Sequence, residues 1–125
     1  MNYSYNIGDY NYYGLFSGCS NLIKPVKILP AATLDEGCYK KMFEDCTQIT
    51  DAPYLPVQKL ISNCYEDMFQ NCSNLSSITV DFENWYDNNA TTNWVNGVAA
   101  DGIFRKIYEL NTEYGASRIP TNWYP

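Results

Sequence analysis

Apolar residues return along this chain at a nearly constant interval. The segments 15–22, 42–49 and 68–75 align without gaps, with an apolar pair, then a cysteine, then an aliphatic residue in each. The interval between aligned positions is 27 residues and then 26. This regularity predicts that equivalent side chains meet in one core. The shared positions are Phe16, Phe43, Phe69, Cys19, Cys46, Cys72, Leu22, Ile49 and Leu75.

Within each segment the apolar residues are spaced as on one face of a helix. From position 38 to 46 they fall at i, i+1, i+4, i+5 and i+8, and the same stripe recurs from 64 to 72. The stripes also place Cys38 and Cys64 in the predicted core. The run 75–80 alternates near its end and is rich in β-branched residues, which predicts a short strand. Prolines then mark a turn.

One helix, one strand and one turn per ~26 residues lies in the period range of leucine-rich repeats. We therefore expect an α/β fold, a short leucine-rich-repeat-like right-handed solenoid over residues 15–80. Residues 81–125 break the period and are expected to form a C-terminal cap, with a short helix within 91–105. The Tyr-rich segment 1–14 lacks a comparable cap, so we expect it to pack on another subunit or on preceding sequence. The whole is one domain.

The motif Phe-x-x-Cys-x-x-Leu/Ile resembles the BspA-type (treponemal-type) leucine-rich repeats of gut-bacterial surface proteins and of phages that infect those bacteria. Segments 92–98, 102–106 and 119–123 are similar to the end of such a repeat array. Asn11 stands where the repeat would place a cysteine. The resemblance implies attachment, either adhesion on cells or receptor binding and fibre structure on virions, and no enzymatic activity. It implies an extracellular location, on a bacterial surface or a virion.

Composition excludes several classes of function. The formal net charge is −6 and only eight Lys and Arg are present, which argues against nucleic acid and against anionic membrane surfaces. No apolar run is long enough to insert into a bilayer, and the N-terminus lacks the features of a signal peptide. The chain has no histidine, which removes Ser-His and Cys-His nucleophilic pairs and His-containing metal sites. We expect no cofactor.

The five cysteines are expected to be buried free thiols that pack as small hydrophobic groups. Disulfides between equivalent positions, such as Cys19–Cys46 or Cys38–Cys64, are the alternative. A metal is least favoured, because cysteines eight residues apart on a helix lie about 12 Å apart. The acidic loop 81–88 is a weak candidate for calcium because it lacks the glycine of an EF-hand loop. The acidic pairs 44–45 and 66–67 are expected to be solvated surface.

The predicted function is a non-catalytic module that binds a protein or glycan receptor. The alternative is a structural virion component that contacts further copies or virion neighbours through its N-terminal segment. An enzyme is the third hypothesis, supported only by surface carboxylates. Aromatic faces stack on sugars and anchor protein interfaces, so the candidate ligand-binding rings are Tyr54, Trp85, Tyr86 and Trp123.

Overall fold

The computed structural model describes residues 12–25, 27, 34–86 and 88–125. Of the Tyr-rich segment 1–14, only the last three residues fall in these ranges, so its expected contacts concern residues that are not described. Within the described ranges, no helix is long and apolar enough to span a membrane.

The expected helix-and-strand solenoid is wrong. The described residues contain no helix, and the two strands found among them, β1 (Ser77–Thr79) and β2 (Ile103–Arg105), form one small parallel sheet. Ile78 lies opposite Phe104 in this sheet. β1 falls inside the run 75–80, whereas the short helix expected within 91–105 is absent and β2 occupies its end. Isolated parallel bridges continue the sheet layer on both sides, between Asp51 and Ser77, Leu55 and Val80, and Ile103 and Tyr124.

Consecutive four-residue turns occupy the stretches where helices were expected. In segment 37–46 every second N–H donates to the carbonyl three residues back, as from Met42 to Tyr39 at 3.1 Å. The intervening N–H groups point away from their own segment, and Phe43 N–H donates to the carbonyl of Met68 at 3.0 Å. A helix would turn all of these groups along its own axis. Here half of them join neighbouring segments instead.

Every fourth residue of these segments has a positive φ, which ends each turn before a helix can form. Lys41 has φ 57°, and the equivalent Asp67 and Asn93 have φ 54° and 53°. Glycine, asparagine and aspartate tolerate this left-handed region best. In segments 37–46, 63–72 and 89–97 they occupy eight of the nine positions with a positive φ, namely Gly37, Asp45, Asn63, Asp67, Asn71, Asn89, Asn93 and Gly97.

Lys41 is the exception, and its replacement tests the turn geometry. We expect Lys41→Gly to raise the free energy of unfolding by about 0.5–1 kcal/mol, because glycine adopts a positive φ without the Cβ clash that lysine suffers. Urea unfolding measures the change. The matched control, Lys40→Gly, loses the ion pair with Glu66 (3.3 Å) at a position without a positive φ and should lower stability. Equal losses in both variants would contradict the geometry.

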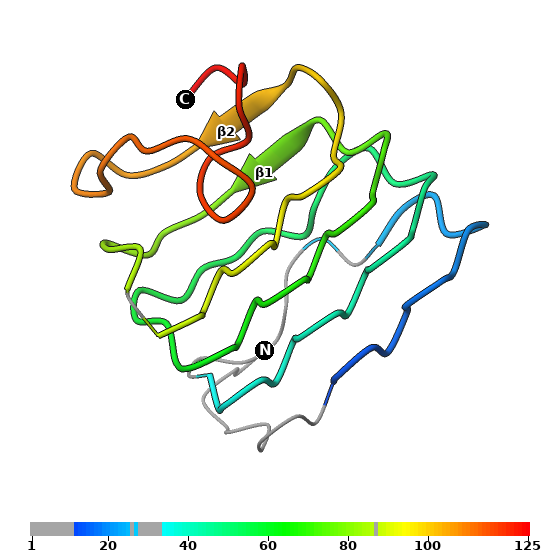
Figure 1. The fold of residues 1–125 in the computed structure, drawn as a ribbon, viewed down its shortest axis with the longest axis horizontal. Coiled ribbons are helices and arrows are strands. Elements are labelled where there is room, and N and C mark those ends of the chain that lie inside the picture. The colour runs from blue at the N-terminus through cyan, green and yellow to red at the C-terminus, as the bar shows by residue number, and fades with distance from the viewer. Residues whose placement is uncertain (1–11, 26, 28–33, 87) are drawn as a thin grey trace.

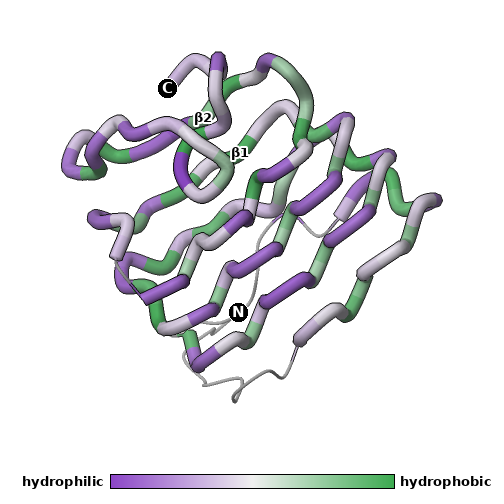
Figure 2. Tube along the Cα trace, viewed as in Figure 1, coloured by the Kyte–Doolittle hydropathy of each residue, from purple (hydrophilic) through white to green (hydrophobic). Residues whose placement is uncertain are grey.

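Four turn segments lie side by side and form one layer of the molecule, opposite the sheet layer (Figure 1). These are residues 12–19, 37–46, 63–72 and 89–97, and in each backbone hydrogen bond between them the earlier segment donates and the later one accepts. Hydrophobic and polar positions alternate along them (Figure 2). The last segment falls within 81–125, the range expected to be a cap without the repeat.

Equivalent aromatic side chains stack between neighbouring turn segments. The ring centroids of Phe16 and Phe43 are 5.5 Å apart, and those of Phe43 and Phe69 are 5.8 Å apart, with nearly parallel planes. Among the predicted core positions, Phe16 and Leu22 are only partly buried and Cys19 is exposed. Those that are fully buried are Phe43, Phe69, Cys38, Cys46, Cys64, Cys72, Ile49 and Leu75.

All five cysteines are free thiols. Two of them connect neighbouring turn segments by hydrogen bonds. Cys46 Sγ donates to the carbonyl of Phe16 and Cys72 Sγ to that of Phe43, both at 3.0 Å. Burial raises the pKa of Cys38 and Cys46 to about 11, and the pKa of Cys64 and Cys72 to about 12. These buried thiols therefore stay protonated at neutral pH and are poor nucleophiles.

The C-terminal end closes tightly over the sheet. Trp123 is 2% exposed, and its indole N–H donates to the carbonyl of Ala99 at 2.8 Å. Gly102 allows this approach, because a Cβ there would lie 2.4 Å from the carbonyl oxygen of Ser76 and 2.8 Å from the Trp123 ring. Any side chain at position 102 would push the end of the chain away from the sheet.

Candidate ligand-binding cleft

Two adjoining hollows lie where residues 84–86 and 89–92 meet the closing loop 111–118. The larger, about 490 Å³, is lined by residues 84–86 and by Asn111, Glu113 and Arg118. The smaller, about 280 Å³, is lined by Tyr86, by residues 89–92 and by Ser117 and Arg118. Tyr86 and Arg118 border both hollows. We call the two together the Tyr86–Arg118 cleft.

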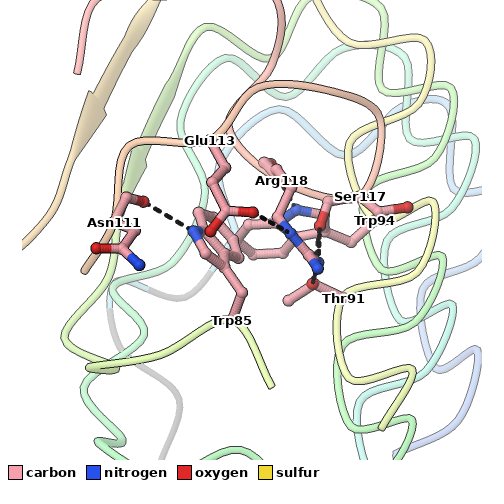
Figure 3. Close-up of polar contacts among 7 residues, drawn as sticks. All are labelled: Trp85, Thr91, Trp94, Asn111, Glu113, Ser117 and Arg118. Atoms are coloured by element: carbon pink, nitrogen blue, oxygen red, sulfur yellow. Dashed lines mark hydrogen bonds and ion pairs between the residues drawn. The ribbon is translucent and has the colours of Figure 1, made fainter. Parts of the chain in front are cut away.

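Trp85 forms a fixed base beneath the larger hollow. Its side chain is 5% exposed, and its indole N–H donates to the carbonyl of Asn111 at 2.8 Å (Figure 3). The ring also meets Phe82 and Trp94 edge-on, at centroid distances of 5.3 and 6.2 Å. Edge-to-face aromatic contacts of this kind stabilise a defined ring orientation. The base of the cleft is therefore set by the core.

Arg118 connects the closing loop to this base. Its Nε lies 3.3 Å from Oε1 of Glu113, its Nη1 donates to the carbonyl of Ser117 at 3.0 Å, and its guanidinium carbon is 5.5 Å from the centre of the Trp85 ring (Figure 3). The guanidinium thus lies over the aromatic ring in a cation–π arrangement. Arg118 and Glu113 are the charged residues among the described lining of the two hollows, and their charges cancel.

The closing loop is anchored to the last turn segment by further hydrogen bonds. Trp94 Nε1 donates to the carbonyl of Arg118 at 2.8 Å, and the hydroxyl of Thr91 donates to the carbonyl of Ser117 at 2.9 Å. Thr91 and Trp94 are both buried. Two bonds from buried donors hold the loop in register, so both walls of the smaller hollow have fixed positions.

Tyr86 has a backbone conformation that is rare for an aromatic residue. Its φ is 56°, and its side chain is partly exposed at the border between the two hollows. A bulky residue in the left-handed region costs of order 1–3 kcal/mol, and such residues concentrate at binding and active sites. Tyr86 also falls outside the four-residue spacing of the turn segments, so that geometry does not account for its φ.

The four predicted ligand-binding rings do not form one site. Trp85 and Tyr86 line the cleft, with Trp85 nearly buried. Trp123 is core at the C-terminal end. Tyr54 donates a hydrogen bond to the carboxylate of Asp81, which raises the pKa of the Tyr54 hydroxyl. Neither Tyr54 nor Trp123 lines either hollow of the cleft.

Sequence reasoning missed Asn111, Glu113 and Arg118. One signal points to them, because the repeat interval continues past residue 81. Trp85 bonds to Asn111 and Thr91 to Ser117 across 26 residues each. Applying the interval to these two residues would have predicted which loop covers them.

The described acidic groups that were considered for metal binding or catalysis do not line the cleft. Among the described residues, no three metal-ligating side chains gather at one place. Asp45 accepts a hydrogen bond from the Asn71 amide, and Glu66 pairs with Lys40. Burial raises the pKa of Glu44 and of Asp67. Asp87 of the loop 81–88 lies outside the described residues.

Comparison of the chain with protein-family models, with curated proteins and with solved structures finds no significant match. The resemblance to BspA-type repeats therefore rests on the motifs alone and stays a prediction.

Proposed function

We propose that this protein is a non-catalytic binding module whose ligand occupies the Tyr86–Arg118 cleft, and that it acts in attachment on a bacterial surface or a virion. One observation carries the proposal: two adjoining hollows share a partly exposed tyrosine with φ 56°. Burial of the surrounding groups supports it further. Trp85, Thr91 and Trp94 position the walls through hydrogen bonds that exist before any ligand arrives.

The lining chemistry favours binding over catalysis. The cleft presents amides, a phenol, hydroxyls and one Arg–Glu pair. Groups of this kind fix the orientation of a bound molecule by hydrogen bonds. Acyl transfer would require a nucleophile next to a base, and the chain has no histidine to serve as that base. The buried cysteines are poor nucleophiles because burial raises the pKa of their thiols.

Removal of the Tyr86 side chain tests the proposal. We expect Tyr86→Ala to weaken binding to ligands identified on glycan and peptide arrays by at least about tenfold, as truncating a central aromatic contact does. Tyr108→Ala is the matched control, because Tyr108 is 96% exposed and does not line the cleft. If both variants bind the array ligands like the unmodified protein, the ligand does not use this cleft.

A structural virion role is the second candidate, and an exposed apolar edge favours it. Turn segment 12–19 lies at one side of the turn layer (Figure 1) and leaves Leu15 53% exposed, and Ile23 just after it is 62% exposed. Apolar side chains on an outer segment fit contact with a neighbouring subunit. Sedimentation velocity measures this association, and a monomer at every concentration would contradict it.

A further inference from the structure

We infer that the Tyr86–Arg118 cleft takes an uncharged oligosaccharide of at least two sugar units, one in each hollow. The inference rests on the proposed function and adds the ligand class to it. Three features of the cleft carry it: its division into two parts, its charge, and the kind of groups that line it.

The first feature is the division of the cleft. Hollows of about 490 and 280 Å³ adjoin at Tyr86 and Arg118. Sites for small molecules usually measure roughly 300–1,000 Å³, so each hollow suits a compact group and the two together suit a longer one. A linear molecule built from linked rings matches this shape. The shared tyrosine would contact the ligand where its two units are joined.

The second feature is charge. The guanidinium of Arg118 already has Glu113 at 3.3 Å and the carbonyl of Ser117 at 3.0 Å. An anionic ligand would have to compete with Glu113 for it, within a chain whose formal net charge is −6. A cationic ligand would have to compete with Arg118 for Glu113. Among the described residues that line the cleft, neither sign of charge finds an unpaired partner, which favours a neutral ligand.

The third feature is the chemistry of the lining. Asn84, Asn89 and Thr92 line the hollows with groups that both donate and accept hydrogen bonds, as sugar hydroxyls do. Arg118 covers the Trp85 ring, so Tyr86 is the ring left to stack on a sugar face. The apolar side chain of Ala90 is fully buried. A peptide ligand that needs an apolar pocket for an anchor residue would find none in this lining.

Calorimetric titration tests the inference with glucose, galactose and mannose, their neutral di- and trisaccharides, and the matching uronates. We expect a disaccharide to bind at least tenfold more tightly than its monosaccharide, a trisaccharide within about threefold of the disaccharide, and the uronates more weakly than the neutral sugars. Thr92→Tyr fills the smaller hollow. It should remove the additional affinity that the second sugar unit contributes, while monosaccharide binding persists. Gln70→Tyr, outside the cleft, is the matched control and should bind like the unmodified protein.

The outcomes separate this inference from the proposed function. Equal affinities for mono- and disaccharides, or preference for a uronate, would overturn the two-unit neutral ligand. Binding of a peptide, but of no sugar, that depends on Tyr86 would also overturn it and would leave the proposed binding function standing. If no ligand of either kind depends on Tyr86, both the inference and the proposed function are overturned.

Discussion

Replacement of Phe43 by alanine is expected to lower the free energy of unfolding by about 5 kcal/mol. Removing a buried phenylalanine costs roughly 3–5 kcal/mol through lost transfer energy and the remaining cavity. Phe43 is fully buried and also loses its stacking on Phe16 and Phe69, each worth about 0.5–1.5 kcal/mol. The total free energy of unfolding of a small domain is about 5–15 kcal/mol. Urea unfolding followed by near-ultraviolet circular dichroism measures the loss.

The end of the same stack provides the matched control. Phe16 is partly buried and contacts one stacked ring, that of Phe43. We therefore expect Phe16→Ala to cost about 2 kcal/mol, less than half of the loss at Phe43. Equal losses at the two positions would show that the stack does not concentrate stability at its centre.

Stability is expected to fall steeply as the pH rises from 8 to 10. The pKa of Cys38 and Cys46 is raised to about 11, and that of Cys64 and Cys72 to about 12, because burial disfavours the thiolate. In the unfolded chain these thiols have an ordinary pKa near 9. Between the two values the folded protein holds more protons than the unfolded one, so the free energy of unfolding decreases with pH. Well below pH 9 the thiols are protonated in both the folded and the unfolded state, so this loss is absent there.

The size of the expected loss in the free energy of unfolding comes from the four buried thiols together. At pH 10 each contributes a loss of between about 1 and 2 kcal/mol, and the four together lose roughly 5–6 kcal/mol. Urea unfolding in the presence of a reductant, at pH 8, 9 and 10, measures it. In a Cys38→Ala/Cys64→Ala double variant, the decrease in the free energy of unfolding between pH 9 and 10 should fall to about half of that in the unmodified protein, whatever the starting stability of the variant. A free energy of unfolding that is constant from pH 8 to 10 would contradict the burial of these thiols.

The recurring apolar positions could be found from the sequence, but the conformation between them could not. A stripe at i, i+4 and i+8 fits a helix, and it fits four-residue turns equally well. The residues that distinguish the two are those at positive φ, such as Asn63, Asp67 and Asn71. Their spacing of four is visible in the sequence once a turn is considered. Lys41 obscures it, because lysine gives no sign of a left-handed backbone.

The candidate cleft was only half visible in the sequence. Trp85 and Tyr86 stand out as large rings in a polar loop, whereas Trp123 stands out equally and is core. Whether a tryptophan faces solvent or the interior depends on what covers it, and for Trp85 that is Arg118 from a distant loop. The positive φ of Tyr86 has no signal in the sequence either, because tyrosine is not a residue type that favours the left-handed region.

The direction of the hydrogen bonds between turn segments has a consequence for self-association. In segment 12–19 the carbonyls of Leu15 and Ser17 accept no backbone bond from the described residues, whereas the equivalent carbonyls of Met42 and Glu44 each accept one. Two molecules related by a twofold axis at this edge would therefore bring acceptor against acceptor. Symmetric pairing through these two carbonyls lacks donors, so a chain that pairs with them must bring N–H groups of its own.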